Sequence, residues 1–186
     1  MDKIKVLQVG DILGVRDGKS FVARGISYYM RKFCKKHNIL YKKIYHHNAR
    51  VVDIWGELFI SEANAKGVQT QKPLEAYSQK DWDNRIDIFR PIIPYTEAEK
   101  RNISKLSVNY SNKQTRYDFL NLIYHIIYIK TGKWIGPKGK KAEYRMYCSE
   151  LIATVEDYIR PLTFKEPFAT NPMMVVTNST LTLINT

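Results

Sequence analysis

The sequence contains a cysteine at the point where a helix is expected to begin. Cys148 lies in the segment RMYCSELIATVEDYI, between an irregular stretch and an amphipathic helical pattern. A helix N-terminus offers partial positive charge and unpaired N–H groups, which favour a thiolate over a thiol, and Arg145 adds to the same bias. The first-turn amides would also help to hold an oxyanion. A lone cysteine is more often a small buried hydrophobe, so this pattern needs support from other residues.

A thiol nucleophile needs a base that is held rigidly within reach of it. The segment YHHNARVV is rich in β-forming residues and contains His46 and His47. Successive side chains of a strand point to opposite faces, so at most one of these histidines is expected to face the thiol. Without further information, both also fit ordinary surface positions.

A carboxylate near the base would fix the tautomer of the imidazole by accepting its hydrogen bond. Glu62 in FISEANAKGV is the candidate, because it lies on the strand expected to return beside the histidines. Asn64 is expected on the same face of that strand and is an alternative orienting residue. A strand-end carboxylate without any such role is the simpler interpretation of a lone glutamate.

The elements that position these residues follow from the spacing of apolar side chains. The 3.6-residue period predicts helices over residues 20–36, 117–130 and 148–159. Thr96 and Glu99 fit a capping box and predict another helix start. Extended segments are expected at residues 6–15, 40–52, 57–63 and 86–93 and from residue 67 onward.

A turn at residues 53–56 would join two of the extended segments into a β-hairpin, which places His47 and Glu62 on neighbouring strands. Residues 73–82 are expected to form a short helical connector. The apolar runs of the tail, residues 168–176 and 181–184, are expected to be strands or extended cover.

The ordered set of motifs resembles a known family. GDIL near the N-terminus, a His-x-Ala-Arg-Val-Val strand, SEANAKGV, and YD followed by YCSEL occur in this order over residues 10–158. This order is similar to that of the circularly permuted papain-like amidases, the permuted branch of the NlpC/p60 superfamily, which includes bacterial, phage and poxvirus-like members. In that branch the histidine strand comes first, its hairpin partner carries an acidic or polar residue, and the nucleophilic cysteine comes last.

The resemblance implies a single α+β domain over residues 1–186, with an antiparallel sheet packed against helices. It also implies a cysteine hydrolase that works through a thioester, with Cys148 as nucleophile, His47 as base and Glu62 as third residue. No metal or cofactor is expected. The chain departs from the family in having Asn48 and Ala49 after the histidine, where Val-Gly is frequent. The neighbouring His46 leaves the register of the base open by one residue.

Relatives in that family point to bonds in cell-wall peptides, other amides, or acyl bonds of lipids as substrates. Tyr147, Arg145 and Lys141 are expected to line the site. The segment of residues 130–145 is rich in lysine. If it borders the cleft, it favours an anionic substrate such as wall peptides or a lipid surface. A solvated loop is the simpler interpretation of this segment.

The formal net charge of +12 leaves two other classes of function open. One is a nucleic-acid-binding protein, although no known recognition module is present. The other is a non-catalytic virion or structural protein that retains the fold and assembles with partner proteins. No secretory signal and no apolar stretch of about 20 residues is evident. We therefore expect a cytoplasmic or virion-associated protein that is not an integral membrane protein. Two cysteines are too few for a disulfide-stapled scaffold.

Overall fold

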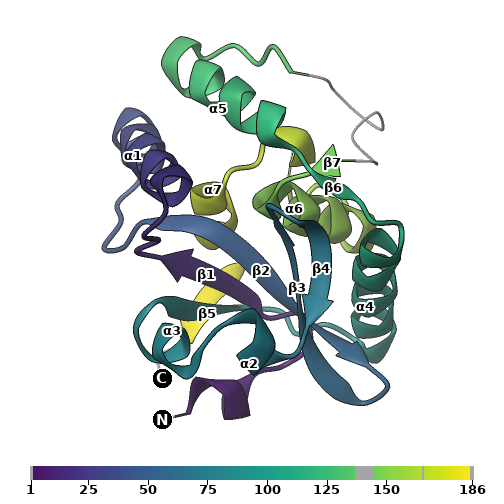
Figure 1. The fold of residues 1–186 in the computed structure, drawn as a ribbon. Helices are drawn as coiled ribbons and strands as arrows, with labels where there is room; N and C mark the ends of the chain where they lie inside the picture. Colours follow the sequence, from purple (N-terminus) through teal and green to yellow (C-terminus); the bar gives the residue numbers. More distant parts are fainter. Residues whose placement is uncertain (1, 137–144, 165, 185–186) are drawn as a thin grey trace.

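A six-stranded antiparallel sheet lies at the centre of the computed structural model, which describes residues 2–136, 145–164 and 166–184 (Figure 1). Its strand order is β4-β3-β2-β1-β5-β8. The strands are β1 (Ile12–Arg16), β2 (Tyr45–Ile54), β3 (Glu57–Asn64), β4 (Gly67–Gln71), β5 (Ile86–Pro91) and β8 (Leu181–Ile184). A short parallel pair, β6 (Arg116–Tyr117) and β7 (Arg145–Met146), lies apart from this sheet.

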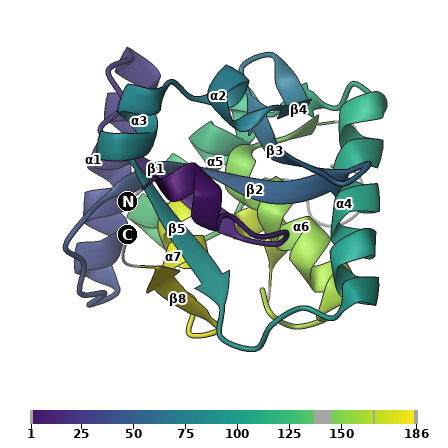
Figure 2. The same ribbon diagram turned by 90° about the horizontal axis from the view of Figure 1, so that it is seen from below.

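Helices cover both faces of the sheet (Figures 1 and 2). One face packs against α1 (Phe21–Lys36), α4 (Glu97–Asn112), α6 (Cys148–Ile159) and α7 (Pro172–Val176). The other face packs against η1 (Lys3–Val6), α2 (Pro73–Ala76) and α3 (Gln79–Asn84). The remaining helices are α5 (Phe119–Thr131), which lies beside α1 at the outside of the first helix layer, and the short η3 (Pro167–Ala169).

The core is divided by the sheet, because successive residues of a strand face opposite sides. The face toward α1, α6 and α7 buries Ile12, Phe33, Phe89 and Ile152. The face toward α3 buries Leu13, Val51, Ile60 and Trp82. Full burial of such side chains stabilises the fold by about 1.5–3 kcal/mol each. The observed architecture is therefore α+β, with an antiparallel sheet packed against helices, as expected from the sequence.

The predicted helix boundaries are confirmed by their caps. Ser20 caps α1, and the side chain of Asp118 caps α5 by accepting the N–H of Asn121. Thr96 and Glu99 form the expected capping box at the start of α4. Gly132 ends α5 in the left-handed conformation, at a φ of 72°, which glycine adopts without steric cost.

The prediction for the first apolar run of the tail was wrong. Residues 172–176 form the helix α7 rather than a strand. The reason is local, because the Asn171 side chain accepts the N–H of Met174 and Pro172 occupies the first helical position. The second run does form a strand, and β8 extends the sheet beside β5.

The β2–β3 hairpin has two irregularities that shape the site. Val15 pairs with His47 whereas Arg16 pairs with Tyr45, so β2 holds an extra residue, His46, in a β-bulge. The pairing of β2 with β3 runs from the turn only as far as Arg50. The two strands therefore separate beyond that point.

No helix in the described part of the chain is long and apolar enough to cross a membrane.

Candidate active site

Cys148 is the first residue of α6 and is almost fully buried. Burial by itself raises the pKa of its thiol. The charge and hydrogen bond of His47 outweigh burial and lower the pKa, as do the backbone N–H groups of Asn48 and Ser149, which donate to the sulfur. The N–H of Asn48 lies on the part of β2 that no longer pairs with β3. The separation of these strands therefore leaves room for the helix N-terminus beside the histidine strand.

His47 is held between Cys148 and a carboxylate. Its Nε2 lies 2.8 Å from Oε2 of Glu62. A carboxylate only accepts hydrogen bonds, so Nε2 carries the proton and Nδ1 is the ring atom left for Cys148. The side chains of Cys148, His47 and Glu62 thus form one hydrogen-bonded chain. The structure brings together the three residues proposed from the sequence.

Glu62 is fixed by two further donors. The hydroxyl of Tyr77 donates to Oε2, and Nδ2 of Asn64 donates to Oε1 over 2.8 Å. Burial raises the pKa of Glu62, but the hydrogen bonds from His47, Tyr77 and Asn64 outweigh it and lower the pKa to about 2. Glu62 is therefore ionised at neutral and mildly acidic pH. Asn64 supports Glu62 by donating to it and does not take its place beside His47.

The imidazole of His47 is charged at neutral pH. Burial lowers its pKa, but the thiolate of Cys148 and the carboxylate of Glu62 outweigh burial and raise the pKa to about 10. The lowered pKa of Cys148 and the raised pKa of His47 describe one coupled pair. Both shifts favour the same charged form of the pair, a thiolate beside an imidazolium.

His46 has a different role from His47. The bulge interrupts the regular alternation of β2, and His46 lines a cavity that also contains Cys148. Burial lowers the pKa of His46 to about 4, with a contribution from the charge of His47. His46 is therefore neutral at physiological pH, and His47 alone makes the contacts with Cys148 and Glu62.

Two hollows flank this group of residues. The first, of about 350 Å³, lies between α1, α5 and the starts of α6 and α7, and Cys148 and Tyr147 are in its wall. The second, of about 450 Å³, is bordered by His47, Glu62 and Tyr117. Both share wall residues of α1, so together they form a cleft beside the thiol.

Tyr147 lines the cleft as expected, whereas Arg145 does not. Arg145 is exposed on β7 and lines neither hollow. Lys141 lies outside the described residues. The other cysteine, Cys34, is a buried core residue of α1, and neither cysteine forms a disulfide.

Sequence reasoning missed Tyr77 and Asn171. Tyr77 follows α2 and donates to Glu62 from a distant part of the chain. Asn171 is buried in the wall of the first hollow. The signal for Asn171 was its place directly before Pro172, which is typical of a helix N-cap. Nothing in the local sequence distinguishes Tyr77 from other tyrosines.

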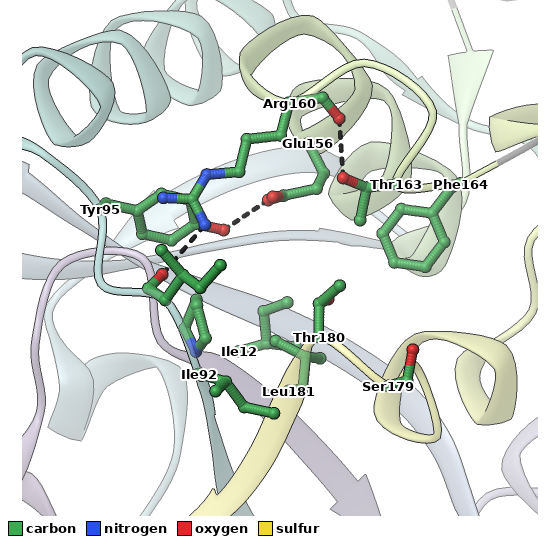
Figure 3. A pocket seen from close by; sticks show the side chains of 12 residues that line it. Ile12, Ile92, Tyr95, Glu156, Arg160, Thr163, Phe164, Ser179, Thr180 and Leu181 are labelled. Atoms are coloured by element: carbon green, nitrogen blue, oxygen red, sulfur yellow. Dashed lines mark hydrogen bonds between the residues drawn. The ribbon is translucent and has the colours of Figure 1, made fainter.

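A third cavity, of about 300 Å³, lies at the C-terminal end of α6, between the end of β5 and the start of β8 and away from Cys148 (Figure 3). Tyr95 donates to Glu156 there over 2.6 Å, and Arg160 stacks on the Tyr95 ring at 4.4 Å. Its wall contains no cysteine or histidine. We therefore assign no chemistry to it.

Replacing Glu62 with glutamine is expected to lower the pKa of His47 by about 1–3 pH units, because a neutral amide replaces a nearby negative charge. The imidazolium is then lost at a lower pH than in the wild type. NMR titration of the His47 ring measures this change. Glu57→Gln on the same strand is the matched control, since Glu57 is exposed and pairs with Lys72. An unchanged titration of His47 in Glu62→Gln would contradict the assigned role of Glu62.

No protein-family model and no curated protein matches the chain. The solved structure of the metalloprotein YiiX from Escherichia coli O157:H7, described as DUF1105, is similar to it with a TM-score of 0.64. The two share 15% sequence identity, and the match covers 96% of each chain. At this identity the likeness concerns the fold alone, and the chain shares with that protein its overall α+β architecture.

Proposed function

We propose that this chain is a thiol hydrolase of the circularly permuted papain-like type, which cleaves an amide, ester or thioester bond. The observation that carries the proposal is the hydrogen-bonded chain from Cys148 through His47 to Glu62. It starts at a helix N-terminus, where a thiolate is favoured. The order of a histidine strand, an acidic strand and a final cysteine helix supports the permuted assignment.

The proposed reaction has two steps. The Cys148 thiolate attacks the acyl carbon, a thioester forms, and the bond to the amine, alcohol or thiol breaks as His47 gives that leaving group its proton. Water then attacks the thioester while His47 accepts a proton from the water, which releases the acid and restores the thiolate–imidazolium pair. Glu62 keeps the imidazole oriented by accepting Nε2–H throughout.

The description of YiiX as a metalloprotein raises the question of a metal at this site. Both ring nitrogens of His47 are already engaged, one by Glu62 and the other by Cys148. Within the described residues, no three or more His, Cys, Asp or Glu side chains are grouped so that they could hold a metal ion. The donor set does not fit a metal, and no step of the proposed reaction uses one.

A panel of activated acyl donors tests this proposal. We expect p-nitrophenyl esters to give a burst of about one nitrophenolate per protein, with the acyl group found on Cys148 by mass spectrometry of peptides. Cys148→Ala should show neither burst nor acylation. Hydrolysis that persists in Cys148→Ala, or a Cys148 that no donor acylates, would contradict the proposal and favour a non-catalytic protein.

A further inference from the structure

Among the described residues, the wall of the hollow beside Cys148 is mainly apolar and, apart from Cys148 itself, holds no charged side chain. Its apolar side chains are Val22, Ile26, Tyr29, Met30, Leu122 and Ile126. The imidazoles in the wall, His46 and His125, both have a pKa lowered to about 4, mainly by burial. They are neutral at physiological pH, so the described residues of this wall offer no positive charge to an anionic group. Pockets of this size and lining bind apolar ligands.

The orientation of His125 follows from the hydroxyl of Tyr147. That hydroxyl lies 2.9 Å from the carbonyl oxygens of both Phe168 and Thr170, and 2.5 Å from Nε2 of His125. The hydroxyl of Tyr147 has one proton, and this proton points toward a carbonyl oxygen. Otherwise both carbonyl oxygens would face lone pairs of the hydroxyl oxygen and repel them. Nε2–H of His125 therefore donates to the Tyr147 oxygen, and this hydrogen bond fixes the position of the neutral ring in the wall of the hollow.

Thr170, the residue before Asn171, holds Asn171 close to Cys148. The carbonyl oxygen of Thr170 accepts from Ser149 Oγ at 2.8 Å and from Tyr147 at 2.9 Å. The residues before and after Cys148 are therefore both bound to the residue before Asn171. This contact fixes the start of α7 against the start of α6.

The side-chain amide of Asn171 has a donor without a partner. Asn171 is 1% exposed, and its Oδ1 accepts the N–H of Met174 over 3.0 Å. That bond fixes the orientation of the amide, so the free group is Nδ2, which has no hydrogen-bond partner among the described residues. An unpaired buried donor costs about 1–3 kcal/mol. A ligand oxygen in the hollow would remove this cost.

We propose that this hollow binds the acyl group that is transferred to Cys148, that the acyl group is apolar, and that Nδ2 of Asn171 donates to its carbonyl oxygen. The inference rests on the proposed hydrolase function and specifies its substrate. As the C–S bond forms, the carbonyl oxygen gains negative charge, and a donor fixed beforehand stabilises that charge. The apolar group is either a fatty acyl chain or the side chain of a hydrophobic residue on the acyl side of a peptide bond.

Gly25 allows the hollow to be filled without disturbing the fold. It lies inside α1 and in the wall of the hollow, and a Cβ built on it would have no atom within 4 Å. A larger residue also favours the helix over glycine by about 0.5–1 kcal/mol. Gly25→Leu therefore narrows the hollow, and Gly25→Ala is the matched control that leaves most of its volume.

The experiment compares acetyl, octanoyl and N-acetylphenylalanyl p-nitrophenyl esters. We expect wild type and Gly25→Ala to be acylated faster by an ester with a large apolar group than by the acetyl ester. In Gly25→Leu the ratio of that preferred rate to the acetyl rate should fall by about 10-fold or more. Preference for octanoyl points to a lipid source, and preference for N-acetylphenylalanyl points to a peptide source.

Asn171→Ser tests the amide donor. Serine still caps α7, because its hydroxyl accepts the N–H of Met174, but it lacks the amide N–H group. We expect acylation by the preferred ester to fall about 10²–10³-fold. The alkylation of Cys148 by iodoacetamide should be unchanged, because that reaction forms no oxyanion.

The results separate the inference from the proposed function. Acylation of Cys148 with no preference for apolar groups, or a preference that Gly25→Leu does not alter, would overturn the inference and leave the hydrolase standing. An Asn171→Ser variant that is acylated at the wild-type rate would overturn the assigned role of Asn171. If no ester acylates Cys148, both the proposed function and the inference fail.

Discussion

Replacing His47 with alanine is expected to move the pH midpoint of Cys148 alkylation from below the ~8.5 of a free thiol to above it. In the wild type the imidazolium of His47 lowers the pKa of the buried thiol. Without it, burial raises the pKa of the thiol, and only the backbone N–H groups of Asn48 and Ser149 oppose burial. A thiol with a pKa of about 8.5 is less than ~1% ionised at pH 6, so little thiolate should remain at that pH in His47→Ala. The rate of reaction with iodoacetamide between pH 4 and pH 10 measures the change.

The sign of this effect follows from the direction of each pKa. Below the pKa of Cys148 the thiol is protonated and reacts slowly, and above that pKa the rate should reach its plateau. A less acidic thiol gives a more nucleophilic thiolate, so the rate at pH 6 should fall less than the thiolate fraction, but still by about 10-fold or more. The pH midpoint of alkylation therefore reports the effect of His47 more directly than the rate at pH 6 does.

His46→Ala is the matched control for this prediction. His46 is neutral at physiological pH, so its removal takes no charge from the vicinity of the thiol. We expect its alkylation profile to follow that of the wild type. A wild-type midpoint near that of a free thiol would contradict the ion pair. A large change in His46→Ala with none in His47→Ala would reverse the assignment of the base.

Replacing Glu156 with alanine is expected to destabilise the fold by about 3–5 kcal/mol. Arg50 on β2 is 1% exposed, and its Nη2 lies 2.7 Å from Oε2 of Glu156 on α6. Its Nε and Nη1 have no partner among the described residues. Removing Glu156 would leave a buried guanidinium without a counter-charge. Urea denaturation measures the loss as a lower midpoint at an unchanged slope.

Two variants control this second prediction. Glu97→Ala removes the exposed pair with Lys100, which should cost about 1 kcal/mol or less. The double variant Arg50→Met, Glu156→Leu removes both buried charges and should regain most of the stability lost by Glu156→Ala. If Glu156→Ala lowered the free energy of unfolding by no more than Glu97→Ala, the buried ion pair between Arg50 and Glu156 would not stabilise the packing of α6 on β2.

The sequence determined the elements and much of the candidate site. Apolar periodicity and caps are local signals, because a helix depends on residues within four positions of one another. They were sufficient to place Cys148 at the start of α6 and to place His47 and Glu62 on the arms of one hairpin. In the first run of the tail, the helix cap formed by Asn171 outweighs the extended tendency of the apolar composition.

Only the tertiary structure decided which histidine meets the thiol and what surrounds it. The bulge at His46 exists because β1 pairs with β2 in two registers, and no property of the HH dipeptide encodes that pairing. The bonds of Tyr77 to Glu62 and of Ser149 to Thr170 join elements far apart in the chain. Local sequence fixes the conformation of a segment, but such contacts form only when packing of the apolar faces brings the segments together.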